Sequence, residues 1–419
     1  MNFIHFSTSD TGGAGNAAYT LHKNLIENGN NSILFVSNKN TLDGTVVQIS
    51  NIFLLYLLKI FYKISHYIKI FKKNYYFHNS KLVTILSSKK IIKLLEFRPD
   101  FIIIHSISNF VSLKLIYKIY KHFNVPVFWF LMDMAPFTGG CHFSWGCNNY
   151  SNDCGNCPAI NYFFLKSLAK KNLKYKKKYL KKININIISI SEFLLKQSIS
   201  SELFLGLKSS YMPLGINDNI FKPVIEKKSI RLLNKVPIDK KIILFSTSDI
   251  MEKRKGFDYL LKSLVNIEIN KNLFSKELIL ITFGVLKKEI NFKNIKHIHF
   301  PYEASVQKRV EIYNLADIFI CTSIEDSGPS TLTEVMSCGI PVVAFDTGDA
   351  QKYIVNDHNG YKVRLKDVTD LENKIFKIFS LKKAEIDLFS KNSRNFVLNN
   401  LNKDKQLKIF KDIILSKNE

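Results

Sequence analysis

The stretch ADIFICTSIEDSGPSTLTEVMSCGIPVVAFDTG, residues 316–348, constrains the fold more than any other part of the chain. An apolar run at 318–321 is followed by a Ser-Gly-Pro turn at 327–329, a helical pattern and a second apolar run at 342–345. Short apolar runs that are bounded by turn residues and separated by a helix are typical of parallel α/β proteins. The sequence therefore predicts a strand, turn, helix and strand in this order.

Two acidic residues, Asp326 and Glu334, flank the predicted turn and the start of its helix. The free N–H groups at a helix start favour an anion, and Gly328, Pro329 and Ser330 are the candidates to border it. Carboxylates beside an anion are unfavourable unless they bind another group, and sugar hydroxyls are good donors to them. A nucleotide sugar satisfies both halves of such a site. The simpler alternative is an exposed acidic pair at a helix N-terminus.

The order of these residues resembles a known signature. An acidic residue, seven intervening residues, Glu334 and then Met-Ser-Cys-Gly-Ile-Pro-Val-Val-Ala-Phe are similar to the donor site of the retaining glycosyltransferases of family four, which have the GT-B fold. In that family the first acid is usually Glu. Here Asp326 stands at the matching position with Glu325 beside it, so either carboxylate is a candidate contact for the donor hexose. The resemblance implies that Glu334 holds the ribose hydroxyls.

A glycine-rich segment, DTGGAGNAAYTLHKNLIENG, follows the predicted first strand at 2–7 and leads into an amphipathic helix. Glycines let the backbone approach a diphosphate at a helix N-terminus, although a tight connection is the alternative. The segment resembles the first loop of the family's N-terminal domain. Gly13 and Gly15 are therefore predicted to contact the donor.

Three basic residues, Lys253, Arg254 and Lys255, follow the first predicted strand of the second half of the chain. A basic side chain aimed at a leaving diphosphate neutralises charge that grows in the transition state. The resemblance assigns this contact to Lys255, with Arg254 or Lys253 as a second positive charge. A basic surface cluster is the alternative. Gly284 ends a later strand that, in relatives, leads to the nucleobase.

Two predicted strands, 101–105 and 127–131, end near polar residues. Ligands of open α/β sheets gather at the carboxyl ends of strands, so His105 and Asp133 are expected near the active cleft. Relatives usually carry a His where this chain has Met132. Asp133 follows as it does in the family, and it is predicted to orient the acceptor.

The segment PFTGGCHFSWGCNNYSNDCGNCPAI, residues 136–160, has the cysteine spacing C-x5-C-x6-C-x2-C. Clustered thiols in a chain without a signal peptide argue against disulfides and for a structural metal. We predict a zinc tetrathiolate, with His142 as a substitute ligand, and reduced loop thiols or a redox pair as alternatives. The segment resembles an insert of family-four enzymes of colanic-acid and other surface-polysaccharide synthesis. The predicted ligands are Cys141, Cys147, Cys154 and Cys157.

The charge of the chain favours anionic partners. Its 60 Lys and Arg against 35 Asp and Glu give a net charge of +25, which suits nucleotide diphosphates, nucleic acid or an acidic membrane. A Lys, Asn and Ile bias across the whole chain is the alternative. No nucleic-acid-binding signature accompanies the charge, so no nucleic-acid partner is predicted. The N-terminus, MNFIHFSTSD, lacks a basic start and a cleavage site, which predicts a cytoplasmic protein.

Two basic segments are candidates for membrane contact. Residues 52–77 are apolar and aromatic with interspersed lysines, which fits an amphipathic helix in the membrane interface, and a core helix with a basic outer face is the alternative. Residues 165–182 are very basic and suit an anionic lipid surface or a solvated face. We therefore expect peripheral association with the inner face of the cytoplasmic membrane.

Together these patterns predict a GT-B protein with two Rossmann-like, doubly wound parallel-sheet domains and a cleft between them. The expected boundaries are 1–215 for the acceptor side, 216–395 for the nucleotide-sugar side and 396–419 for a helix that returns to the first domain. The predicted activity is retaining transfer of a hexose to a saccharide or lipid-linked saccharide in surface-polysaccharide synthesis, without a catalytic metal. The alternatives are a non-catalytic, membrane-associated protein and a sugar-nucleotide 2-epimerase.

Overall fold

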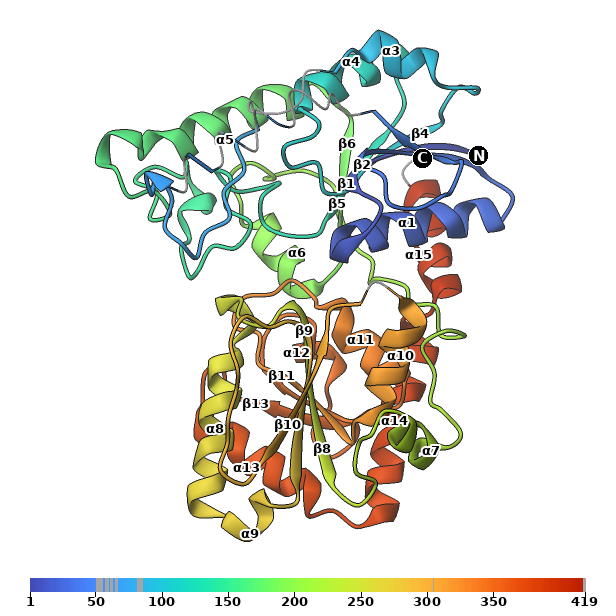
Figure 1. Cartoon of the computed structure of the whole chain (residues 1–419). Coiled ribbons are helices and arrows are strands. Elements are labelled where there is room, and N and C mark those ends of the chain that lie inside the picture. Colours follow the sequence, from blue (N-terminus) through green and yellow to red (C-terminus); the bar gives the residue numbers. More distant parts are fainter. Residues whose placement is uncertain are drawn as a thin grey trace. The chain divides into compact units, whose positions relative to one another are not determined.

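The computed structural model describes residues 1–49, 56, 60, 63–64, 67–80, 86–303 and 305–416. Part of the predicted amphipathic helix at 52–77 lies outside these residues, and its described end at 68–77 forms turns and isolated bridges in place of a helix. The chain forms two compact units, Met1–Gly215 with Gln406–Glu419, and Ile216–Lys405 (Figure 1). Each unit has its own parallel sheet and hydrophobic core, which confirms the predicted fold class.

The first unit contains a seven-stranded sheet in the order β3-β2-β1-β4-β5-β6-β7, in which every neighbouring pair is parallel. The strand order reverses between β1 and β4, the place where open α/β sheets bind ligands. The strands are β1 (Asn2–Ser9), β2 (Asn31–Asn38), β3 (Val46–Gln48), β4 (Phe101–Ile104), β5 (Val127–Leu131), β6 (Ile185–Ser189) and β7 (Ser209–Tyr211).

The helices of the first unit include one from the C-terminal end of the chain. Leu407, Phe410 and Ile414 of that helix, α15, are buried in one cluster with Phe3 and Phe128 of the sheet. The segment predicted as 396–419 is thus divided, since the preceding helix α14 ends at residue 400. The helices are α1 (Gly12–Glu27), α3 (Ser88–Lys93), α4 (Leu113–Phe123), α5 (Ser167–Leu180), α6 (Glu192–Ile199) and α15 (Lys403–Leu415), with short 3-10 helices at Asn149–Ser151 and Phe163–Leu165.

The second unit repeats the same topology with six strands in the order β10-β9-β8-β11-β12-β13, all parallel. Its order reverses between β8 and β11. The strands are β8 (Lys241–Asp249), β9 (Leu278–Val285), β10 (Lys296–Pro301), β11 (Ile318–Cys321), β12 (Val342–Phe345) and β13 (Gly360–Val363). The helices are α7 (Lys227–Leu233), α8 (Phe257–Asn270), α9 (Asn272–Ser275), α10 (Val306–Leu315), α11 (Ser330–Ser337), α12 (Ala350–Tyr353), α13 (Val368–Phe379) and α14 (Lys383–Asn400), with a 3-10 turn at Lys253–Lys255.

The central strands follow from their composition. Every residue of β4, β5 and β11 is buried, as expected for uninterrupted apolar runs in parallel sheets that are covered on both faces. The edge strands β3 and β7 have only three residues each and were not predicted. A run of three residues is too short to show an apolar pattern of its own.

Buried histidines make the first unit sensitive to acid. His5 Nδ1 lies 3.1 Å from His105 Nε2, and both rings are fully buried beside His22 of α1. Burial lowers the pKa of His105 to about 3 and that of His22 to about 4, because the charged imidazolium loses its hydration. The folded chain therefore binds fewer protons at these sites than the unfolded chain, whose imidazoles have pKa values of about 6.5.

We expect the free energy of unfolding to fall as the pH drops below about 6.5, by about 1.4 kcal/mol per pH unit for each of these two histidines. Urea titrations at about pH 7 and about pH 5 measure this slope. His22→Gln keeps a polar side chain but removes one titrating ring, so its slope should be smaller. The exposed His122→Gln serves as the control, and an unchanged slope in His22→Gln would contradict the assignment.

Candidate functional site

A small cavity lies in the second unit at the carboxyl ends of β8 and β11, where the strand order reverses. The start of helix α11 closes one side of it through Pro329 and Thr331. Ser330 is the first residue of this helix, and Pro329 precedes it without a side-chain cap. The free amides at a helix start suit an anion. The polar lining consists of Ser246, Thr247, Lys255, Thr322, Ser323 and Thr331.

Lys255 reaches this cavity because the turn that carries it lies directly against β11. The next residue, Gly256, has φ +67°, and a Cβ atom there would meet the Thr322 carbonyl oxygen at 2.0 Å. The Thr322 hydroxyl also donates to the Lys255 carbonyl at 3.2 Å. Only glycine permits this approach together with a left-handed backbone. The sequence Lys255-Gly256 thus places a lysine at the edge of the cavity.

Asp326 is buried and accepts hydrogen bonds on both carboxylate oxygens. Its Oδ2 accepts hydrogen bonds from Arg254 Nη1 at 2.9 Å, from Lys255 Nζ, and from the Ser323 hydroxyl at 3.3 Å. Its Oδ1 accepts a hydrogen bond from the Gly328 amide at 3.3 Å. Burial alone would raise the pKa of Asp326, but the ammonium and guanidinium groups outweigh this effect and hold the pKa at about 2. Asp326 is therefore an ionised counter-ion that orients Lys255.

Arg254 is held by two carboxylates. Its Nε and Nη2 donate to Glu252, while Nη1 donates to Asp326 and, at 3.4 Å, to the carbonyl oxygen of Glu325. The Glu325 residue is less buried than Asp326. Because Arg254 is paired twice and does not line the cavity, Lys255 is the cation that the structure presents to a ligand there.

Glu334, in helix α11, forms a buried cluster with helix α10. Its Oε1 lies 3.1 Å from Arg309 Nη1, and the Tyr313 hydroxyl donates to Oε2 at 2.8 Å. Burial raises the pKa of Glu334, and the two partners oppose this shift. Sequence reasoning missed both partners. Arg309 and Tyr313 are four residues apart, which places both side chains on one face of a helix. This spacing was the only sequence feature that could have indicated a shared partner.

The predicted glycines occupy different environments. A Cβ atom at Gly15 would meet the Ser9 carbonyl oxygen at 2.8 Å, so close packing of α1 on β1 accounts for this glycine. Gly13 has open space around it in the first turn of α1. Gly284 lies in β9, next to the end of β8, where its Cα approaches the Thr247 carbonyl. The structure therefore leaves Gly13, rather than Gly15, free to face a ligand.

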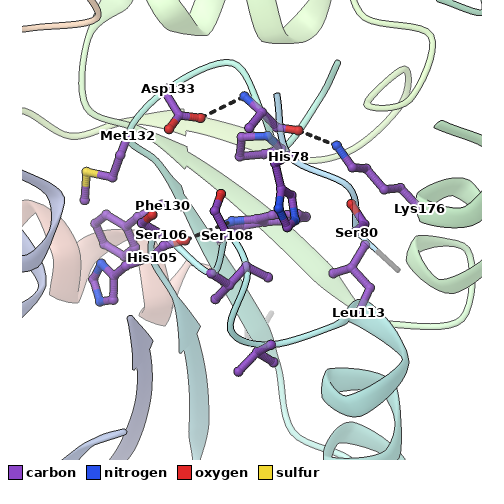
Figure 2. A pocket seen from close by; sticks show the side chains of 15 residues that line it. His78, Ser80, His105, Ser106, Ser108, Leu113, Phe130, Met132, Asp133 and Lys176 are labelled. Atoms are coloured by element: carbon purple, nitrogen blue, oxygen red, sulfur yellow. Dashed lines mark hydrogen bonds between the residues drawn. The ribbon is translucent and has the colours of Figure 1, made fainter. Parts of the chain in front are cut away.

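The first unit has a pocket of its own with a mixed polar and apolar lining, beyond the carboxyl ends of β4 and β5 (Figure 2). In this view Met132, Phe130 and His105 lie on one side, and Lys176 lies on the other. Asp133 Oδ1 accepts a hydrogen bond from the Ala135 amide at 2.7 Å, and Asp133 Oδ2 lies 2.8 Å from His142 Nδ1. Burial raises the pKa of Asp133, but His142, the Ala135 amide and His78 together outweigh it, and the net shift of the pKa is downward.

His142 was predicted as a substitute metal ligand, and the structure instead pairs it with Asp133. The cysteine-rich segment thus holds a residue of the pocket through His142, and its first residue, Pro136, lines the pocket itself. Lys176, from the basic helix α5, is also buried there and donates to the Thr138 carbonyl at 2.9 Å and to that of Ala135. Burial lowers the pKa of Lys176 to about 8. Sequence reasoning placed this lysine on a solvated or lipid-facing surface, because helical periodicity alone did not distinguish it from its neighbours.

The four clustered cysteines line one apolar cavity together with Tyr75, Phe77 and Tyr150. All four are free thiols. Backbone amides donate to two of the sulfur atoms, from Gly139 to Cys154 at 3.1 Å and from Asn149 to Cys147 at 3.5 Å. Within the described parts of the chain, however, no three or more His, Cys, Asp or Glu side chains are arranged to hold a metal ion. The donor types suit zinc, but their arrangement here does not form a coordination sphere.

The second unit also matches a known family of proteins. Residues 228–396 match the family model of glycosyl transferases group 1. Over 169 residues the chain is 28% identical to an uncharacterized glycosyltransferase of Methanocaldococcus jannaschii, a match that covers 38% of this chain and 42% of that protein. Over 232 residues it is 20% identical to the UDP-Gal:alpha-D-GlcNAc-diphosphoundecaprenol alpha-1,3-galactosyltransferase of Escherichia coli, covering 52% and 57% of the two chains. The chain thus spans about half the length of the curated relatives it matches.

Solved structures share the fold of the whole chain. HepE of Anabaena, solved with UDP and glucose, superposes with a TM-score of 0.66 at 14% identity and covers 99% of this chain and 100% of its own. This likeness establishes the two-domain GT-B architecture. Among the residues that the structure describes, no helix combines the length and apolar character needed to cross a bilayer.

Proposed function

We propose that this protein is a retaining hexosyltransferase that moves a hexose from a nucleotide-diphosphate sugar to a saccharide or lipid-linked saccharide acceptor. One observation carries the proposal. Lys255 lines a cavity at the strand-order reversal, beside the start of α11, within the segment that matches group 1 glycosyl transferases. A cation and free helix amides at this place suit a diphosphate.

In the proposed reaction the diphosphate is the leaving group. Lys255 and the first amides of α11 stabilise the negative charge that grows as the glycosidic bond breaks. Glu334 accepts hydrogen bonds from the ribose hydroxyls, and Glu325 or Asp326 faces the hexose. The acceptor hydroxyl attacks the oxocarbenium-like carbon from the face that the diphosphate leaves. Its proton passes to a donor phosphate oxygen, and the configuration is retained.

The acceptor in this proposal is bound by the first unit, whose pocket is lined by Asp133, the partner of His142. The relative from Escherichia coli acts on a diphosphoundecaprenol-linked sugar, which supports a lipid-linked acceptor in surface-polysaccharide synthesis. An anionic membrane surface, on the inner face of the cytoplasmic membrane, is then the expected partner.

A thermal-shift titration of the pure protein with nucleoside diphosphates and their hexose conjugates tests the donor site. We expect one nucleotide to raise the Tm, with a shift that grows with concentration as for a site present only in the folded state. Release of the nucleoside diphosphate from the sugar conjugate should accompany transfer. Binding without release would favour a non-catalytic protein, and no shift with any nucleotide would refute the donor site.

For the cysteine-rich segment the proposal is a structural zinc ion: the four thiols line one cavity, and they would have to draw closer together there to form its coordination sphere. We expect about one zinc per chain in protein purified without added zinc. Metal analysis and alkylation of the thiols measure this. Absence of zinc together with rapid alkylation of the four cysteines would identify them as reduced loop thiols.

A further inference from the structure

Two segments that are far apart in the sequence lie side by side at the edge of the first unit. The Lys72 amide donates to the Ala159 carbonyl at 2.9 Å, and the Asn161 amide donates to the Ile70 carbonyl at 3.0 Å. The Tyr162 hydroxyl donates to the Ile68 carbonyl at 2.7 Å. These bonds join residues 68–72 to residues 159–162, the turn that precedes helix α5.

The joined segments expose large apolar side chains to solvent. Phe163 is 83% exposed, Phe164 75% and Tyr67 86%, and Ile68 and Tyr162 are each at least 40% exposed. We call these five residues the aromatic edge. Exposed apolar patches that bring together several large side chains mark contact surfaces for partners. The edge was not predicted as a unit, because its two halves are almost a hundred residues apart.

The sequence stretches that carry the aromatic edge contain basic residues and no acidic ones. Neither residues 44–95 nor residues 154–191 contain an Asp or Glu. Helix α5 runs along the outside of the first unit (Figure 1). Its ion pairs among the described residues are Lys170 with Asp153 and Lys177 with Glu202. This leaves five exposed lysines on or directly after the helix, namely Lys171, Lys174, Lys178, Lys181 and Lys182.

We propose that an anionic lipid bilayer covers this surface, with the aromatic edge at the level of the head groups and the α5 lysines on anionic lipids. Aromatic rings that combine with lysines and lack acidic neighbours are suited to this environment. A second copy of the chain is a poor occupant, because its own surface carries the same positive charge. The proposal rests on one part of the proposed function, the lipid-linked acceptor, because such an acceptor lies in a bilayer.

Co-sedimentation with vesicles tests the proposal without any turnover. The full chain should bind vesicles of phosphatidylcholine with phosphatidylglycerol, and binding to phosphatidylcholine alone should be much weaker. The double variant Phe163→Ser and Phe164→Ser should lose affinity about ten-fold or more. Its matched control is Leu232→Ser with Leu233→Ser in α7, a pair that is also exposed but lies in the second unit.

Charge is tested separately. Lys171→Gln, Lys174→Gln and Lys178→Gln together should weaken binding by about five-fold per lysine. The control replaces three exposed lysines of the second unit, Lys228, Lys276 and Lys391, by Gln. Both sets remove the same net charge, so a difference between them locates the contact.

Several outcomes would overturn the proposal. Equal binding to both kinds of vesicle, equal losses in the test and control variants, or tight binding of a single-stranded oligonucleotide in place of the vesicles would each do so. The nucleotide thermal shift is measured on the same variants to show that they are folded. If that shift is absent from the wild-type protein while vesicle binding persists, the donor-site proposal fails and the membrane surface stands.

Discussion

Lys255→Ala should lower kcat/KM for the donor by about 10²- to 10³-fold, which is the effect of removing one positioned charge donor from a transition state. Lys255 is the cation that lines the cavity in the second unit, and its side chain is only 13% exposed. A group already oriented by Asp326 needs little rearrangement as charge develops on the diphosphate. Initial rates of nucleotide release at several donor concentrations measure the effect.

The neighbouring lysine provides the matched control. Lys253 belongs to the same turn but is exposed, so Lys253→Ala should retain nearly wild-type turnover. Full activity of Lys255→Ala would remove it from the donor site. We expect Lys255→Ala to stay folded, because Asp326 keeps Arg254 as a partner in this variant. An unchanged Tm would show that the fold is retained.

Glu334→Ala should have two large effects. The change leaves the Arg309 guanidinium, whose side chain is 17% exposed, without its carboxylate, and such losses cost about 3–5 kcal/mol. It also removes the proposed acceptor of the ribose hydroxyls, which should weaken nucleotide binding about 10- to 100-fold, as expected for a hydrogen bond to a charged group. Urea titration measures the first effect, and the nucleotide thermal shift measures the second.

Two further variants separate the structural role from the binding role. Glu334→Gln keeps the size of the side chain and an oxygen that can accept from Tyr313, so it should recover part of the stability but not the full nucleotide affinity. Arg309→Gln keeps the carboxylate and should lower stability while nucleotide binding persists. If Glu334→Gln binds the nucleotide as tightly as the wild-type protein, Glu334 acts only as a structural partner of α10.

Much of the fold could be predicted from the sequence, because its signals are local. The apolar runs that become β4, β5, β11 and β12 are bounded by turn residues and separated by helical patterns, and such runs have few alternatives to parallel strands. The same holds for the turn before α11, where Gly, Pro and a helix start appear in order. The resemblance of the motif at Asp326 and Glu334 to a donor site depended on residues within one short stretch.

The partners of the site residues could not be predicted in this way. Asp133 pairs with His142 of the cysteine-rich segment, and Glu334 pairs with Arg309 of α10. Asp326, which follows β11, pairs with Lys255, which follows β8. Each pair joins two elements that are separate in the sequence. The sequence around either member alone fits an exposed, solvated charge just as well as a buried, paired one. Burial selects these pairings, because an ionised group removed from water needs an opposite charge or a hydrogen-bond donor beside it.

By itself, the sequence determined the class of fold, the order of the elements and the places where charged residues meet the ends of strands. Only the tertiary structure decided which charges pair with one another and which of the paired groups also line a cavity. Arg254 and Lys255 are adjacent and chemically alike, yet the first is paired with two carboxylates and the second lines the cavity. The physical reason is that periodicity and turn chemistry act between near neighbours, whereas desolvation depends on every segment that packs around a group.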